Sequence, residues 1–210
     1  MIVFYLDTTS NYLYTGINKD KQLLIEKKLC LNHDLSTFSL NEIYKMFEEV
    51  NLKPNDIDKI IVNNGPGSFT GIRIGVTIAK TLAWCLNKKI TTVSSLEAMA
   101  ESIETDKLTV PIINARRGYV YGAIFDHDKV ILRDEYLSLE KLKLILNGLN
   151  KEYVFISSDK FNDIEIVNYV PNISKIMNKY QDREEINAHF VNPCYLKLTE
   201  AEENKMKEEV

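Results

Sequence analysis

The first half of the chain shows two hydrophobic periods. Short apolar runs bounded by polar turns are typical of buried strands, whereas apolar residues that recur every three or four positions indicate amphipathic helices. Strands are predicted at residues 2–6, 12–17, 23–29, 57–62 and 90–93. Helices are predicted at residues 35–50 and 69–86 and from residue 94 onward.

The second half repeats the order of strands followed by a helix in a looser form. Strands are predicted at residues 108–114, 119–125, 130–137 and 153–157, with a helix at 138–146. This order resembles the ribonuclease-H-like lobe of the actin-like ATPase (ASKHA) superfamily, which includes sugar kinases. The sequence therefore predicts an α/β fold of two such lobes, residues 1–103 and residues 104–210.

Composition and charge narrow the class of protein. The chain has 210 residues, of which 45% are hydrophobic, which is enough to build a core without cross-links. Its net charge of −4 argues against autonomous RNA binding, because proteins that bind RNA alone normally carry a basic excess. Three widely spaced cysteines indicate a reducing compartment. The apolar N-terminus reaches Asp7 after six residues, too few for a signal peptide or membrane span, so a cytoplasmic protein is expected.

A glycine-rich segment, GPGSFTGIRIG, occupies residues 65–75 between a predicted strand and a predicted helix. Four of the eight glycines of the chain fall in it. A glycine-rich turn before a helix can bind phosphate through free N–H groups and the helix dipole. However, its spacing matches neither the P-loop, which requires GxxxxGK, nor the dinucleotide motif GxGxxG. The segment is therefore not a nucleotide-binding loop of either type.

Small residues in this segment continue into the long helix at a fixed spacing. Gly67, Gly71, Gly75 and Ala79 recur every four residues and form a flat stripe on one helix face. Each glycine inside a helix costs about 1 kcal/mol relative to alanine, so a close contact must offset that cost. One explanation is tight packing on the protein's own sheet, and the other is docking of a partner's helix. If docking is correct, Gly71→Leu should leave the fold intact and block association.

The end of the first strand is a second candidate site, because sugar kinases place a phosphate loop there. Asp7 and Thr8 supply an acid and a hydroxyl, but the turn has no glycine. Side chains of this kind also form hydrogen bonds at strand ends without binding any ligand. Beyond Gly122 the only glycine is Gly148, so a second phosphate loop and an adenosine loop have no candidate. A stand-alone ASKHA-type kinase or ATPase is the alternative that this composition disfavours.

No metal site or hydrolytic triad is predicted. The histidines, at positions 33, 127 and 189, form no HxxxH or HExxH pair, and no serine lies in a GxSxG elbow. We therefore expect no cofactor and no catalytic residue. Arg116 and Arg117 lie in a predicted hairpin turn, where they could meet a phosphate or a carboxylate, or simply be solvated.

Several blocks of sequence, in order along the chain, resemble the hallmark motifs of the TsaB family. They are the glycine-rich segment, then SSLEA at residues 94–98 and ARRG at residues 115–118. DTT at residues 7–9 resembles the family's opening strand end, and residues 193–196 and 200–202 resemble its closing motif.

The resemblance implies two ASKHA lobes with a degenerate nucleotide site and a non-catalytic function. Family members bind the catalytic subunit TsaD, which transfers threonylcarbamoyl to an adenosine beside the tRNA anticodon, and the ATPase TsaE joins the pair. The chain would contact tRNA only through this complex, and it could form a homodimer when TsaD is absent. Helices of the first lobe form the family interface, which implies contacts at or beside Ile43, Phe47, Gly67, Phe69, Gly71, Ile72, Gly75 and Ala79.

The chain departs from the family pattern at two positions of the hairpin. Asn114 stands where an aspartate is usual, and Tyr119 stands where a glutamate is usual. Any family role that depends on those two carboxylates is not expected here.

Overall fold

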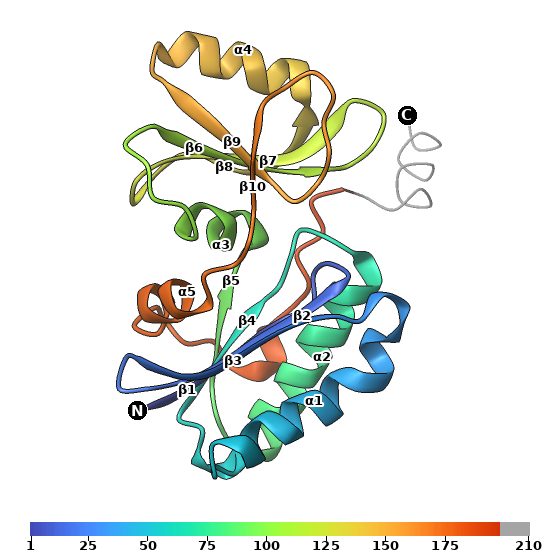
Figure 1. Cartoon of the computed structure of the whole chain (residues 1–210), viewed down its shortest axis with the longest axis vertical. Helices are drawn as coiled ribbons and strands as arrows, with labels where there is room; N and C mark the ends of the chain where they lie inside the picture. Colours follow the sequence, from blue (N-terminus) through green and yellow to red (C-terminus); the bar gives the residue numbers. More distant parts are fainter. Residues whose placement is uncertain (198–210) are drawn as a thin grey trace.

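The computed structural model describes residues 1–197, which excludes the part of the closing motif at residues 200–202. Its first sheet has the strand order β3-β2-β1-β4-β5 (Figure 1). The first three strands form an antiparallel meander, and β4 and β5 extend it in parallel. The strands are β1 (Ile2–Asp7), β2 (Tyr12–Lys19), β3 (Gln22–Cys30), β4 (Lys59–Asn63) and β5 (Ile90–Val93).

The second sheet repeats this topology, with the order β10-β9-β6-β7-β8. Here β6, β7 and β8 form the antiparallel meander, and β9 and β10 are the parallel extension. The strands are β6 (Leu108–Asn114), β7 (Tyr119–Asp126), β8 (Lys129–Ser138), β9 (Tyr153–Ser157) and β10 (Ile166–Asn168). The predicted α/β class and the repeated order of elements are confirmed.

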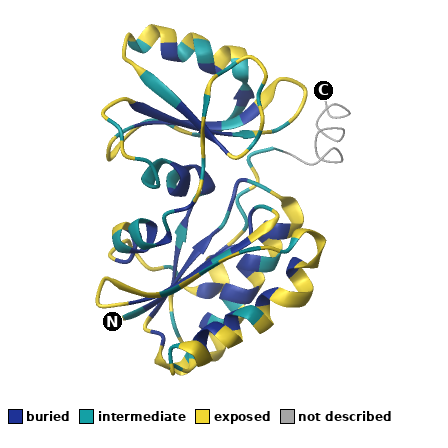
Figure 2. Ribbon diagram, viewed as in Figure 1, coloured by how far each residue is buried: buried dark blue, intermediate teal, exposed yellow. Residues whose placement is uncertain are grey.

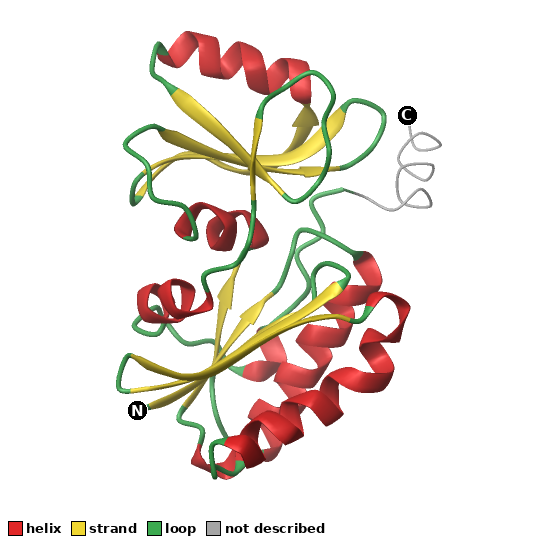
Figure 3. Ribbon diagram, viewed as in Figure 1, coloured by secondary structure: helices red, strands yellow, loops and turns green. Residues whose placement is uncertain are grey.

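Helices cover both faces of each sheet (Figures 1 and 3). In the first lobe, α1 (Leu35–Glu49) and α2 (Phe69–Cys85) pack on one face, and α5 (Ile173–Tyr180) packs on the other. Alternation along β1 produces these two cores, because Phe4 and Leu6 face the two long helices while Val3 and Tyr5 face α5. In the second lobe, α4 (Leu139–Leu149) covers one face, and α3 (Ser95–Glu101) covers the face turned toward the first lobe.

The C-terminal segment returns to the first lobe. Buried Lys59 on β4 donates hydrogen bonds to the carbonyl oxygens of Gln181 and Arg183, at 2.6 and 2.7 Å. Ile186 forms an antiparallel bridge with Ile90 on β5. A single boundary after residue 103 does not account for these contacts. We propose instead that the first lobe comprises residues 1–94 together with the segment from α5 to the end of the described chain, and that α3 belongs to the second lobe, against whose sheet it packs.

Three short helices complete the described elements: η1 (Asn32–Asp34), η2 (Pro54–Asp56) and η3 (Ala188–Phe190). Within residues 1–197, no helix combines the length and apolar character that a membrane crossing requires.

Candidate functional site

The turn after β1 is closed by its own hydrogen bonds. The buried carboxylate of Asp7 accepts the backbone N–H and the hydroxyl of Thr9, both at 2.8 Å, on one oxygen. Its other oxygen accepts the side-chain amide of Asn63 at 2.8 Å and the Tyr5 hydroxyl at 3.3 Å. Burial raises the pKa of Asp7, although these hydrogen bonds oppose the shift. With four donors in place, the carboxylate has no free direction for a metal ion or a nucleotide.

The glycine stripe of α2 packs against this same turn. A β-carbon at Gly71 would lie 2.0 Å from the carbonyl oxygen of Thr8, and one at Gly75 would lie 2.4 Å from the Thr8 hydroxyl oxygen. A β-carbon at Gly67 would lie 2.4 Å from the carbonyl oxygen of Thr9. The Thr8 hydroxyl donates to the carbonyl of Gly71 at 2.7 Å. The glycines therefore allow α2 to touch the backbone of the turn after β1. This agrees with the first of the two explanations given for the stripe, tight packing within the chain itself.

The residues to which the sequence assigned a role differ in how far they are buried. Asp7 and Thr8, considered as possible ligand contacts, are buried. Most of the residues placed at the partner interface are also buried within the chain: Ile43, Phe47, Gly71, Ile72, Gly75 and Ala79. These six residues lie in the chain's own core, so we propose that a partner would be contacted through their exposed neighbours on the same helices. For the same reason Gly71→Leu would disturb the fold itself, contrary to the expectation above.

The outward side of α1 and α2 is exposed (Figure 2), and it carries several large apolar residues. Exposed large hydrophobic residues on the two helices are Phe38, Leu40, Tyr44, Phe69 and Trp84. Trp84, the single tryptophan of the chain, is 69% exposed. Between Phe69 and Trp84 the exposed positions of α2 include small hydroxyl residues at 70, 77 and 81. This is a surface that another helix can approach closely. We call the exposed side of α1 and α2 the helical face; it is made up of these small positions together with Phe38, Leu40, Tyr44, Phe69 and Trp84.

The C-terminal segment borders the helical face at the N-terminal end of α2. The ring of Tyr195 stacks on Phe69, with centroids 4.8 Å apart. Its hydroxyl accepts a 2.8 Å hydrogen bond from Arg73, whose guanidinium lies 3.9 Å from the Phe69 ring centre. The backbone N–H of Cys194 donates to the carbonyl of Asn64 at 2.8 Å. The chain's own C-terminal segment thus covers the glycine-rich turn, and the sequence motifs did not predict this contact.

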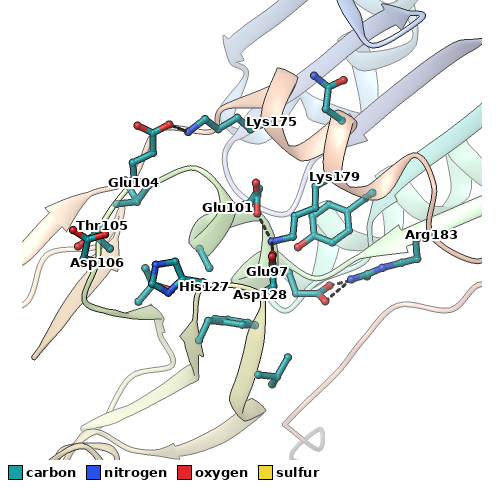
Figure 4. Close-up of a pocket in the computed structure, with 17 residues that line it drawn as sticks. Glu97, Glu101, Glu104, Thr105, Asp106, His127, Asp128, Lys175, Lys179 and Arg183 are labelled. Carbon is teal, nitrogen blue, oxygen red and sulfur yellow. Dashed lines mark hydrogen bonds and ion pairs between the residues drawn. The ribbon is translucent and has the colours of Figure 1, made fainter. Parts of the chain in front are cut away.

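A cavity of about 730 Å³ lies between α3, α5 and the β7–β8 turn (Figure 4). Three basic side chains of the C-terminal segment line it, and each is paired with a carboxylate. Lys175 pairs with Glu104, Lys179 pairs with Glu101 and Asp128, and Arg183 forms a two-pronged pair with Glu97. Because these cations are already neutralised, the cavity offers no obvious site for a phosphate.

Glu97 illustrates how this network shifts a pKa. Burial would raise the pKa of its carboxyl, but hydrogen bonds from Arg183 and from the backbone N–H of Ser94 outweigh burial and lower it. The pair ties α3 to the segment that returns to the first lobe. We interpret it as a structural link between the two lobes.

No group of three or more histidine, cysteine, aspartate or glutamate side chains in the described part of the chain is placed to hold a metal ion. Arg116 and Arg117 differ from the buried Asp7 and Thr8, because both are exposed at the tip of the β6–β7 hairpin.

Comparison with known proteins places this geometry in a family. The family model described as "TsaD: tRNA N6-adenosine threonylcarbamoyltransferase" matches residues 36–152, more than half of the chain. A Bacillus subtilis protein named "tRNA threonylcarbamoyladenosine biosynthesis protein TsaB" is 29% identical over 96% of both chains. The chain belongs to the TsaB family. The Escherichia coli protein of the same name is 38% identical over 77 residues, which are 35% of this chain and 33% of that protein.

Solved structures agree with the TsaB fold. A Pseudomonas aeruginosa protein described as similar to the peptidase YeaZ superimposes with a TM-score of 0.80. The match covers 93% of this chain and 99% of the other at 16% identity, so it speaks for the fold alone.

Proposed function

We propose that the chain is a non-catalytic partner of the TsaD threonylcarbamoyltransferase in tRNA threonylcarbamoyladenosine biosynthesis. The names of its TsaB relatives support a role in that pathway. The observation that supports the partner role most directly is the exposed apolar surface on α1 and α2. We expect the complex to work in the cytoplasm, with TsaE as a further component and tRNA bound only through the complex.

A non-catalytic role agrees with the closed turn at β1. In a kinase of this superfamily, the equivalent turn would need room for phosphates. Here Gly71 and Gly75 bring α2 into contact with Thr8, and the Asp7 carboxylate accepts four hydrogen bonds. Nothing in this geometry favours a stand-alone kinase. Calorimetric titration of the isolated chain with ATP should show no saturable heat.

The helical face is the surface that we assign to TsaD. Large exposed apolar residues of this kind on a folded chain commonly mark a protein contact. The family model named for the transferase matches residues 36–152, which contain α2 and nearly all of α1, so we expect TsaD to have a corresponding pair of helices. Two such pairs can pack as a four-helix bundle. The same face would allow two copies of this chain to pair when TsaD is absent.

Co-purification with TsaD from the same organism tests this assignment. We expect Trp84→Glu, or Tyr44→Glu, to weaken binding about 30-fold or more, because a charge would replace a large exposed apolar side chain of the proposed contact. Leu144→Glu is the matched control, since Leu144 is 71% exposed but lies on α4 of the other lobe. Circular dichroism melts should show that all three variants remain folded. Binding at wild-type strength by both helical-face variants would contradict the assignment.

A further inference from the structure

The β6–β7 hairpin presents two adjacent arginines in an unusual backbone conformation. Arg116, Arg117 and Gly118 all have positive φ angles, of 67°, 53° and 77°. This left-handed region is favourable for glycine and asparagine but costs roughly 1–2 kcal/mol for other residues. The turn is held by hydrogen bonds from Tyr119 N–H to the Arg116 carbonyl and from Arg116 N–H to the Asn114 side chain. The arginines are therefore presented by a defined turn.

A row of tyrosines begins directly after this tip. Tyr119 stacks on Tyr136 of the neighbouring strand, with centroids 4.9 Å apart and an interplanar angle of 16°. Tyr121 contacts the same Tyr136 ring at 5.7 Å. Tyr119 is 41% exposed, so one end of the row is open to solvent. The row is a preformed aromatic platform beside two guanidinium groups.

The charges around the platform favour an anionic ligand. Among residues 1–197, no ion pair or hydrogen bond engages the guanidinium group of Arg116 or Arg117. Lys197 adds a third cation, with its ammonium group 5.6 Å from the Tyr136 ring centre. Two carboxylates lie near the hairpin: Glu135 is engaged by Lys141 at 2.7 Å, and Asp159 accepts the backbone N–H of Asn114 at 2.7 Å, at the base of the turn. The tip itself thus presents two arginines on a chain whose net charge is −4.

We propose that this hairpin is an RNA contact, with one unpaired base stacking on Tyr119 and the adjoining phosphates pairing with Arg116 and Arg117. Aromatic side chains beside arginines are the usual means of holding unstacked bases of single-stranded loops. Two or three cations are too few for autonomous RNA binding, so the contact works as one part of a larger assembly. The proposal therefore rests on the proposed function, in which tRNA is bound by the complex. An acidic protein surface could pair with the arginines but would leave the exposed ring unused.

The test measures tRNA binding by the assembled complex. A fluorescein-labelled tRNA transcript carrying the target adenosine is titrated by anisotropy at several salt concentrations, after size-exclusion chromatography has shown that each variant assembles. Tyr119→Ala should weaken binding roughly 5- to 50-fold, and Tyr119→Phe should bind as the wild type, because it keeps the ring. Arg116→Gln/Arg117→Gln should weaken binding and reduce the slope of log K against log salt by about 1–2.

Two matched controls separate the site from general effects. Tyr12→Ala removes another stacked tyrosine of similar exposure, 40%, on β2. Lys88→Gln/Lys89→Gln removes the same two positive charges from the loop after α2. Both controls should bind tRNA within about twofold of the wild type.

Each outcome decides the proposal. Unchanged affinity and salt slope in the hairpin variants would overturn it. Loss of assembly in those variants, with tRNA affinity falling only as far as assembly does, would assign the hairpin to a protein partner instead. If the wild-type chain fails to assemble with TsaD, the proposed function fails. The RNA contact depends on the assembled complex, so it would fall with the proposed function.

Discussion

The close contact between α2 and the β1 turn predicts an unusual response to Gly71→Ala. Alanine at a helical glycine normally stabilises a protein by about 0.5–1 kcal/mol. Here the added methyl group would lie 2.0 Å from the carbonyl oxygen of Thr8, whereas ordinary van der Waals contact begins near 3.4 Å. The first turn of α2 would have to retreat by about 1 Å. That movement would also stretch the 2.7 Å hydrogen bond from the Thr8 hydroxyl to the Gly71 carbonyl.

These effects can be combined into an expected loss of stability. Overpacking costs about 1–3 kcal/mol, and the hydrogen bond is worth about 1 kcal/mol. After the gain in helix propensity is subtracted, Gly71→Ala should lower the free energy of unfolding by about 1.5–3 kcal/mol. For a chain of this size the melting temperature should fall by about 3–12 °C.

Gly148→Ala provides the matched control, because Gly148 also lies in a helix and a β-carbon there would meet nothing within 4 Å. It should raise the free energy of unfolding by up to about 1 kcal/mol. Thermal and urea unfolding followed by circular dichroism would measure both changes. If Gly71→Ala were neutral or stabilising like Gly148→Ala, the close contact with Thr8 would not exist and the account of the stripe would be refuted.

Three other substitutions test individual contacts. Asp7→Asn replaces one carboxylate oxygen with an NH₂ group that faces the donors of either residue 9 or Asn63, so the free energy of unfolding in urea should fall by about 1–3 kcal/mol. A urea midpoint equal to that of the wild type would contradict the closed turn. Lys59→Met leaves the carbonyl oxygens of residues 181 and 183 without their donor, which should lower the free energy of unfolding by about 2–4 kcal/mol. Backbone amide hydrogen exchange around these two residues should become faster, and unchanged exchange would argue against this contact. Arg183→Gln should cost about 0.5–1 kcal/mol at pH 7. Because the pKa of Glu97 is lowered in the folded state, its stabilisation is present above its unfolded pKa of about 4.3 and is lost as the pH falls through the lowered value. A difference between Arg183→Gln and the wild type that did not shrink as the pH fell below about 4.3 would argue against the pair.

Sequence reasoning missed helix α5 and strand β10 for identifiable reasons. Helix α5 buries Ile173, Ile176, Met177 and Tyr180, whose spacing is helical, and Asn172 caps its start. That signal is present in the sequence and could have been found. Strand β10 has only three residues, Ile166–Asn168, and none of them is buried. Such a strand carries too short a pattern to be recognised without its neighbour β9.

The sequence by itself determined the order of strands and helices and the four-residue spacing of Gly67, Gly71 and Gly75. Such patterns are set by residues close together in the chain, because the period of burial follows from local backbone geometry. The sequence also shows that Gly148 is the only glycine after Gly122. Because the phosphate and adenosine loops of the superfamily depend on glycine, this composition argues against a kinase.

Only the tertiary structure decided which neighbour each surface meets. The glycine stripe could face a partner or its own sheet, and the choice depended on Thr8, which lies 63 residues before Gly71. The exposed side of α1 and α2 likewise became visible only when folding had buried Ile43 and Phe47. Contacts between residues distant in sequence depend on how whole elements pack, and no local period records which of two apolar faces will be covered.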